Sequence, residues 1–151
     1  MSNRVKYFEE FSVGESFEGS YRRTMTESEL VETVALSGLR FPLFNDAEWC
    51  RENVPGGVRR FPGFVTLGIA NAMCEEHVGH GNLGVRVIER VNFHGSIKPG
   101  DTVHASAEVV RIDPGSDPAR GAVVMNVRLY NQNDEMMLEF LPVFTLKKRP
   151  T

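Results

Sequence analysis

The sequence predicts an α+β fold in which a curled antiparallel sheet of about five strands wraps one long buried helix. The helix is predicted by residues 64–78, where apolar side chains occupy most of a helical circumference. The sheet is predicted by the chain after residue 80, where apolar and polar residues alternate and turn sequences separate segments of strand length. A sheet that wraps a helix hides it on most sides, so the two features fit one fold.

Composition is that of an ordinary globular protein with one domain, residues 1–151. Seventeen Lys and Arg against twenty Asp and Glu give a net charge of −3, without a long basic run, which argues against a nucleic-acid partner. No stretch reaches the roughly 20 apolar residues that span a bilayer. The first residues lack the apolar core of a signal peptide, so we expect a cytoplasmic protein without a membrane partner. Cys50, Cys74 and the four histidines show no metal-ligand spacing, and we expect no metal.

The N-terminal part of the chain predicts one strand and one helix. Residues 16–25 have the length and composition of a strand. Thr26 and Glu29 fit a capping box, in which each side chain accepts a hydrogen bond from the backbone of the other residue. The apolar residues that follow recur at helical spacing as far as Ser37, and Gly38 provides the stop.

A short helix is predicted next. Pro42 predicts an extended link after the first helix, because proline also restricts the residue before it. Asn45 or Asp46 can cap the short helix, and Glu48 stands three residues after Asn45, as in a capping box. Residues 53–57, with the sequence NVPGG, end it.

The start of the long helix is the first candidate site. Pro62 and Gly63 form its entrance turn, because proline is tolerated only at a helix start, and Gly79 begins its stop. The backbone N–H groups of Gly63, Phe64 and Val65 then have no acceptor inside the helix and lie at the positive end of its dipole. Such donors suit a thioester carbonyl or a developing enolate oxygen. An ordinary turn in front of a core helix is the plainer alternative.

Four strands are predicted after the long helix. Turn sequences at 98–101 and 131–134, and a loop with two prolines, separate them. Pro142 lies inside the last strand and predicts a bulge or an edge position. The predicted strands are residues 85–93, 102–112, 122–130 and 136–147.

The order of these elements and four short sequences resemble the MaoC-like branch of the hot-dog proteins, which includes (R)-specific enoyl-CoA hydratases and acyl dehydratases. The resemblance spans about residues 7–147 and implies a single hot-dog domain. The four sequences are the helix at 26–38, FPLFND at 41–46, FPGF at 61–64, and VNF at 91–93 followed by the turn KPGDT at 98–102.

The resemblance also assigns positions to the family's catalytic groups. In the family an Asp and a His hold a water and pass its proton, while a Gly backbone N–H polarises the thioester carbonyl. In this chain the catalytic Asp falls on Leu39 and the catalytic His on Phe44. A trailing Asp of the motif matches Asp46, and the carbonyl-binding Gly falls on Gly63. The resemblance therefore implies a site with its oxyanion donor but without either proton carrier, which typically contribute about 10²–10⁴-fold.

Other residues could replace the lost chemistry. Asp46 and His94 are the candidate acid/base residues, and Glu48 is a further carboxylate near the motif. Helix capping by the two carboxylates, and a packed or solvated strand histidine, are the plainer interpretations. Arg59 and Arg60 precede the entrance turn and could hold a CoA phosphate or a substrate carboxylate bidentately, or could be solvated.

Aromatic residues gather in sequence around the expected site. They could line an acyl or aryl tunnel, or form core and dimer interface. They are Phe41, Phe44, Trp49, Phe61 and Phe64.

Three functions remain open from the sequence. The first is an enoyl-CoA hydratase or dehydratase of fatty acid metabolism with a non-standard site. The second is an acyl-CoA thioesterase. The third is a non-catalytic acyl-CoA binder, or the silent subunit of a hetero-oligomer whose active hot-dog subunit supplies the Asp and His. The resemblance implies a homodimer or higher oligomer, an acyl-CoA or acyl-carrier thioester as substrate or ligand, and no separate cofactor.

Overall fold

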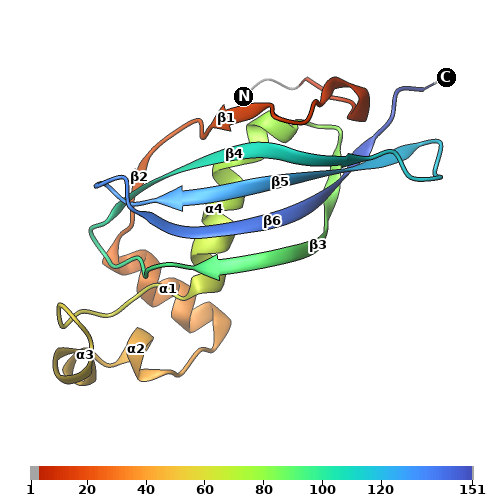
Figure 1. Ribbon diagram of the computed structural model, residues 1–151. Helices are drawn as coiled ribbons and strands as arrows, with labels where there is room; N and C mark the ends of the chain where they lie inside the picture. The colour runs from red at the N-terminus through yellow and green to blue at the C-terminus, as the bar shows by residue number, and fades with distance from the viewer. Residues whose placement is uncertain (1–3, 151) are drawn as a thin grey trace.

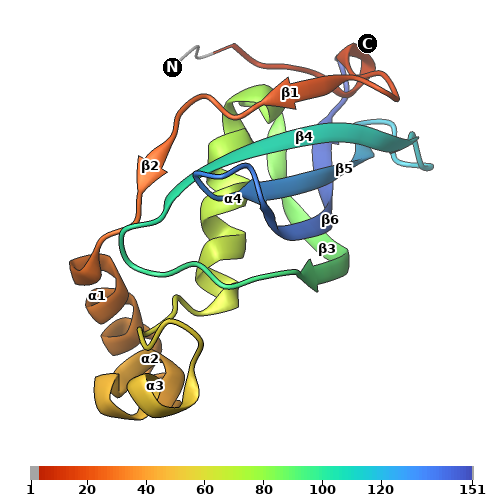
Figure 2. The same cartoon turned by 60° about the vertical axis from the view of Figure 1, so that its left-hand side comes forward.

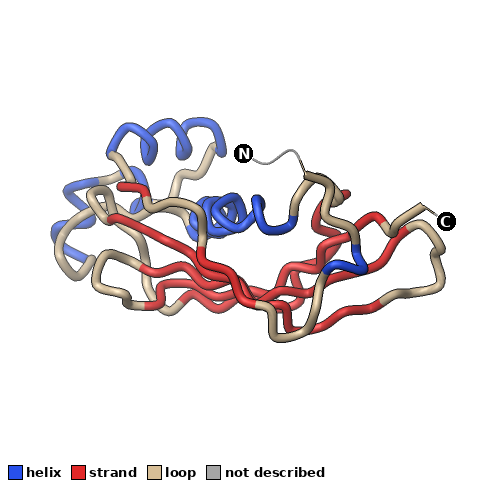
Figure 3. Tube along the Cα trace, turned by 90° about the horizontal axis from the view of Figure 1, so that it is seen from above, coloured by secondary structure: helices blue, strands red, loops and turns tan. Residues whose placement is uncertain are grey.

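A computed structural model describes residues 4–150 and shows a layer of helices on one face of a six-stranded sheet (Figures 1 and 3). The strands are β1 (Ser16–Glu18), β2 (Arg23–Thr24), β3 (Asn82–Phe93), β4 (Thr102–Asp113), β5 (Arg120–Tyr130) and β6 (Met136–Lys147). The helices are the 3-10 helix η1 (Phe8–Glu10) and the α-helices α1 (Glu27–Ser37), α2 (Pro42–Asn45), α3 (Ala47–Asn53) and α4 (Gly63–Val78).

The sheet is antiparallel throughout, with strand order β1-β4-β5-β6-β3 and β2 paired to β4. Helix α4 crosses the middle of the sheet and contacts β4, β5 and β6 (Figures 1 and 2). Alternate side chains of β5, from Val123 to Leu129, are buried against α4 residues such as Met73. The predicted class, a curled antiparallel sheet with one long helix, is therefore confirmed.

Local capping signals set the ends of α1 and α4 as predicted. The Thr26 hydroxyl accepts from the backbone N–H of Glu29, and the Glu29 carboxylate accepts from the backbone N–H of Thr26. Gly38 ends α1 in the left-handed conformation, with a φ of 68°. Pro62 is the N-cap of α4, and Gly79 is its C-cap.

The predicted strand at 16–25 is divided into β1 and β2, so the sheet has six strands rather than five. The division occurs at Gly19, whose N–H donates to the carbonyl of Ala105 at 2.7 Å. A Cβ atom on Gly19 would lie 2.9 Å from that carbonyl oxygen, so only glycine allows so close an approach. At the next residue the chain turns toward α4, where the N–H of Ser20 donates to the carbonyl of Met73.

The extended link predicted at Pro42 is wrong. Pro42 is the first residue of α2, a position where its missing N–H removes no helical hydrogen bond. Phe41 before it is extended, as the sequence predicted, with a φ of −67° and a ψ of 133°. The restriction therefore acts on the residue before proline, while proline itself starts a turn of helix.

The sequence left Asn45 and Asp46 open as the N-cap of the short helix, which is α3 in the structure. Asp46 is the N-cap, and its carboxylate accepts from the backbone N–H of Trp49 at 2.9 Å. The Asn45 amide instead donates to the carbonyl of Leu39 at 2.9 Å. With Asp46 as the cap, Glu48 is the second helical residue and completes no capping box.

Pro142 lies beside a bulge and not at an edge. Strand β6 lies between β5 and β3, and Pro142 is opposite Ile88. Four residues of β3, from Ile88 to Val91, are opposite three residues of β6, from Phe140 to Pro142, at this point. The extra residue lets the sheet accept a proline that cannot donate to the ladder.

One face of α4 is exposed, although the sequence predicted burial on nearly all sides. Phe64, Gly68 and Ala72 recur at four-residue spacing and are exposed. Figure 3 shows the sheet on one side of α4, which leaves this face on the other side. Among residues 4–150, no helix is both long enough and apolar enough to span a membrane.

Candidate functional site

The first turn of α4 presents two free backbone donors. The N–H groups of Val65 and Thr66 donate to the carbonyl of Pro62, at 3.0 and 3.3 Å. The N–H groups of Gly63 and Phe64 have no acceptor among the described residues. Because they lie at the positive end of the helix dipole, they are suited to an oxygen that carries or develops negative charge.

A cavity of about 300 Å³, here the α4 pocket, lies at this turn. It is largely apolar, and no Asp, Glu or His is among its lining residues. The lining residues are Leu39, Leu43, Phe44, Arg60, Phe61, Pro62, Gly63, Phe64, Thr66, Phe93, Gly95, Ser96 and Ile97.

A side chain at position 63 would displace the ring of Phe93. A Cβ atom there would lie 2.6 Å from Cε1 of Phe93, whose ring covers the helix start from the end of β3. The hydroxyl of Thr66 donates to the carbonyl of Gly63 at 2.8 Å and holds the turn from inside. Phe93 was not predicted as a site residue, although it shares a strand face with Val91, which packs against the core, and this is the signal that could have indicated it.

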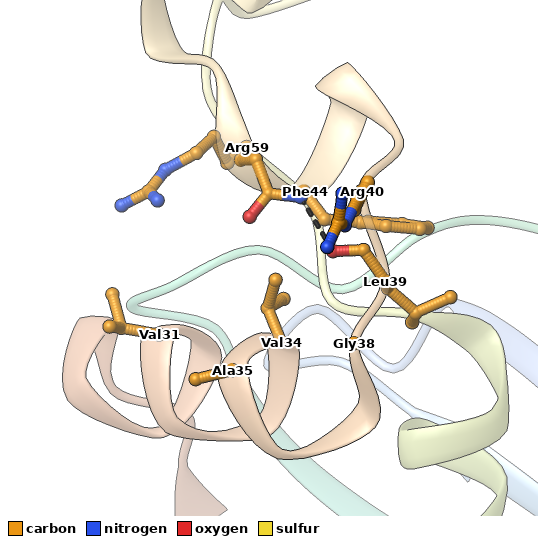
Figure 4. Close-up of a pocket in the computed structure, with 9 residues that line it drawn as sticks. Val31, Val34, Ala35, Gly38, Leu39, Arg40, Phe44 and Arg59 are labelled. Carbon is orange, nitrogen blue, oxygen red and sulfur yellow. Dashed lines mark hydrogen bonds between the residues drawn. The ribbon is translucent and has the colours of Figure 1, made fainter.

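A second cavity, here the α1 pocket, lies between α1 and the segments around residues 40 and 59 (Figure 4). Its volume is about 360 Å³. Figure 4 shows Val31, Val34 and Ala35 of α1 on one side of it and Arg59 on the other. Its lining residues are Val31, Val34, Ala35, Gly38, Leu39, Arg40, Phe44, Asn45 and Arg59.

Leu39 and Phe44 line both cavities. The structure therefore brings together the two positions that the resemblance assigned to the proton carriers, and it places them beside Gly63. Both side chains are half-buried. As hydrocarbon groups they separate the two cavities and can neither hold a water nor transfer a proton.

The consecutive residues Arg59 and Arg60 line different cavities. Arg59 lines the α1 pocket and forms an ion pair with Glu27. Arg60 lines the α4 pocket and is 8% exposed. Its guanidinium donates to the carbonyls of Val58 and Pro55, and no carboxylate lies within ion-pair distance among the described residues.

Asp46 and His94 line neither cavity. Asp46 caps α3, as described above. The Nε2 atom of His94 lies 3.5 Å from Oε1 of Glu139. Glu139 stands between Leu138 and Phe140, which are buried beside α4, so Glu139 and His94 lie on the opposite face of the sheet.

The His94 pair includes a polarised carboxylate. A hydrogen bond from the Asn92 amide holds the pKa of Glu139 below its usual value, and the charges of Arg90 and His94 act in the same direction. The side chain of His94 is 41% exposed. The His94–Glu139 contact therefore lies at the solvated end of β3 and not in the α4 pocket.

The predicted aromatic cluster divides into three environments. Phe61 is buried, and with Phe44 it lines the α4 pocket. Phe64 lines the same pocket but is 82% exposed, so it stands at the mouth. Phe41 lies outside both cavities, against Phe44 and Trp49 with ring-centroid distances of 6.1 and 6.4 Å.

Cys74 and the potential metal ligands form no second site among the residues that the structure describes. Burial raises the pKa of the Cys74 thiol to about 12, which makes it a poor nucleophile. Residues 4–150 hold no group of three His, Cys, Asp or Glu side chains placed to share a metal ion.

Comparisons with known proteins agree with this fold. A curated relative, the beta-methylmalyl-CoA dehydratase of Chloroflexus aurantiacus, is 24% identical over 157 residues, covering 98% of this chain and 42% of the relative. The structure of a monoamine oxidase regulatory protein from Archaeoglobus is 30% identical with a TM-score of 0.88, covering 97% of both chains. A conserved hypothetical protein from Mycobacterium tuberculosis, described as a double hotdog fold, is 19% identical with a TM-score of 0.79, covering 97% of this chain and 45% of that one.

The fold is therefore that of the hot-dog proteins. The sequence also matches the family described as "MaoC like domain" over residues 9–130. This chain belongs to the MaoC-like domain family, and it spans less than half the length of the curated relative.

Proposed function

We propose that this chain binds an acyl thioester in the α4 pocket, with the thioester carbonyl oxygen at the N–H groups of Gly63 and Phe64, and supplies no proton carrier of its own. The observation that carries the proposal is the combination of two free donors with a lining that contains no Asp, Glu or His. The curated relative is named for an acyl-CoA, beta-methylmalyl-CoA, which supports the ligand class.

The donors can polarise a thioester but cannot complete a hydration. Hydrogen bonds to the carbonyl oxygen draw electrons from the α,β-double bond and stabilise the enolate that forms when water adds to the β-carbon. The reaction also needs a base to activate the water and an acid to protonate the α-carbon. Leu39 and Phe44 exclude water from the place where these groups would act, so the isolated site binds and polarises without turnover.

A second hot-dog unit is the natural source of missing groups. Strand β3 has no partner on its outer edge among the described residues, and Val87 on it is 51% exposed. The exposed face of α4 around Phe64 adds a further apolar surface. A long unpaired strand edge beside apolar surface favours pairing with another chain, either an identical copy in a homodimer or an active hot-dog subunit that carries the Asp and His.

A hydratase or dehydratase that works alone is the second candidate. Family membership and the dehydratase activity named for the curated relative favour it. It requires an acid/base other than the two lost residues. Asp46 and His94 would have to reach the α4 pocket through a rearrangement, because neither lines it.

Binding measurements with a matched pair of ligands test the proposal. Butyryl-CoA and its thioether analogue S-butyl-CoA have the same chain length, but only the first has the carbonyl. Net hydrogen bonds contribute about 0.5–1.5 kcal/mol each, so two should favour butyryl-CoA by roughly 5–150-fold in isothermal titration. Equal affinities for the two ligands would show that the N–H groups do not bind the carbonyl oxygen. A lack of binding by both would show that the chain does not bind acyl thioesters of CoA.

Chain assembly is tested separately by sedimentation. We expect a dimer at micromolar concentration and a monomer for Val87→Lys, because a lysine on the β3 edge opposes strand pairing. A dimer that survives Val87→Lys would place the interface elsewhere.

A further inference from the structure

Arg60 is a buried charge without a counter-ion. It is 8% exposed, and no Asp or Glu of residues 4–150 lies within ion-pair distance of it. Arginine is almost never so buried unless it is paired with an acid. The contrast with Arg59 is direct, since that residue is paired with Glu27 on the other side of the same segment.

Several N–H groups of the Arg60 guanidinium have no acceptor among the described residues. Of its five N–H groups, one donates to the carbonyl of Val58 at 2.7 Å and another to the carbonyl of Pro55. The other N–H groups have no acceptor among the described residues. Two backbone carbonyls orient the group but carry no charge, so none of the described residues supplies an anion to it.

The cavity beside Arg60 has one charge only. Apart from Arg60, the α4 pocket is lined by apolar residues and by the small polar side chains of Thr66 and Ser96. Arg60 stands three residues before Gly63, so their Cα atoms are at most about 11 Å apart. One short acyl group can therefore reach both the N–H donors of Gly63 and the side of the pocket that Arg60 forms.

We propose that the acyl group bound in the α4 pocket carries a carboxylate, and that Arg60 binds this carboxylate. The substrate or ligand class is then the thioester of a short dicarboxylic acid. This inference rests on the proposed acyl-thioester site and adds the identity of its acyl group. A planar carboxylate accepts two parallel hydrogen bonds from a guanidinium, which neutralises the buried charge.

A phosphate of CoA is the other anion that an arginine could hold. Arg60 belongs to the lining of the cavity that also contains Gly63, where the proposed thioester site places the acyl group. These positions favour the acyl carboxylate. Free CoA, which carries the phosphates and no acyl group, separates the two sources in the test.

The experiment compares succinyl-CoA with butyryl-CoA by isothermal titration, because the two acyl groups share four carbons and differ in the terminal carboxylate. The wild-type protein should bind succinyl-CoA roughly 10–100-fold more tightly, the range of a charge-assisted hydrogen-bond pair. Arg60→Met should abolish this preference, while Arg60→Lys should retain part of it. Arg59→Met is the matched control and should leave the preference unchanged, because Arg59 lines the other cavity.

Each outcome separates this inference from the function on which it rests. Binding of both thioesters with equal affinity by the wild-type protein would overturn the carboxylate site and leave the thioester site intact. A lack of binding by both would overturn the thioester site itself. A loss of affinity in Arg60→Met that is equal for succinyl-CoA, butyryl-CoA and free CoA would assign Arg60 to a phosphate and also overturn the inference. The preference is the ratio of the affinities for succinyl-CoA and butyryl-CoA in the same variant. Partial misfolding of Arg60→Met would reduce the bound fraction for both ligands and would leave this ratio unchanged.

Discussion

Replacing Phe44 with alanine should join two cavities that the wild-type side chain separates. Phe44 and Leu39 line both the α4 pocket of about 300 Å³ and the α1 pocket of about 360 Å³. In the wild-type protein an acyl chain that starts at Gly63 meets this wall. In Phe44→Ala a longer chain can continue into the α1 pocket, along the apolar side chains of α1.

The size of the effect follows from the methylene groups that leave water. Each buried methylene contributes about 0.8 kcal/mol, so the four that distinguish octanoyl-CoA from butyryl-CoA contribute at most about 3 kcal/mol. The α1 pocket is open to solvent, and Val31 on its floor is 50% exposed. Half of the limit, about 1.6 kcal/mol, corresponds to a gain of roughly 15-fold in the relative affinity for octanoyl-CoA.

Isothermal titration with the two thioesters provides the assay, and Phe41→Ala is the matched control. Phe41 contacts Phe44 but lines neither cavity, so its loss should leave the affinity ratio unchanged. A folded Phe44→Ala protein with the wild-type ratio would refute the shared wall. An equal gain in Phe41→Ala would show that general loosening, not the opening of a partition, admits the longer chain.

Three further changes test local parts of the structure. Gly63→Ala places a methyl group against the Phe93 ring and should lower the free energy of unfolding, measured by chemical denaturation, by about 1–3 kcal/mol. Adding Phe93→Ala should restore most of this free energy. No recovery would mean that the contact with Phe93 is not the cause. Asp46→Ala should lower that free energy by about 0.5–2 kcal/mol through loss of the α3 cap, and a loss of butyryl-CoA affinity would instead place Asp46 in the site. The pKa of Glu139 is lower in the folded state than its unfolded value of about 4.3, so the ionised carboxylate stabilises the fold at pH values above about 4.3. This stabilisation is lost as the pH falls toward the folded-state pKa. Glu139→Gln should accordingly be less stable than wild type at pH 6, by a difference that shrinks as the pH falls below the unfolded value. A constant difference would exclude the linkage.

Local signals in the sequence were sufficient for much of the fold. The capping box of Thr26 and Glu29 and the glycines that end α1 and α4 act within one helical turn, so their effects can be read from adjacent residues. The break at Gly19 depends on the carbonyl of Ala105, far along the chain, and no local pattern contains it. The exposed face of α4 was missed because an apolar residue such as Phe64 does not reveal whether its own chain or another chain covers it.

The candidate site was predictable in part for the same reason. The position of Gly63 at the start of α4 follows from the preceding proline, and the resemblance placed Leu39 and Phe44 beside it. The burial of Arg60 without a counter-ion depends on which distant side chains surround it, and the ring of Phe93 reaches Gly63 from thirty residues away. His94 was ambiguous, because its face of the sheet is set by the register of β3 against β6.

The central claim is that the α4 pocket holds a thioester beside two positions that have lost their proton carriers. Hydration of trans-2-butenoyl-CoA and of fumaryl-CoA, the second of which carries a terminal carboxylate, tests it most directly in the purified wild-type chain and in Leu39→Asp/Phe44→His. We expect background rates from the wild-type chain and measurable turnover from the double variant, because the new carboxylate and imidazole would lie beside the donors of Gly63. Turnover by the wild-type chain well above background would contradict the claim, since a proton carrier would then already be present in the site.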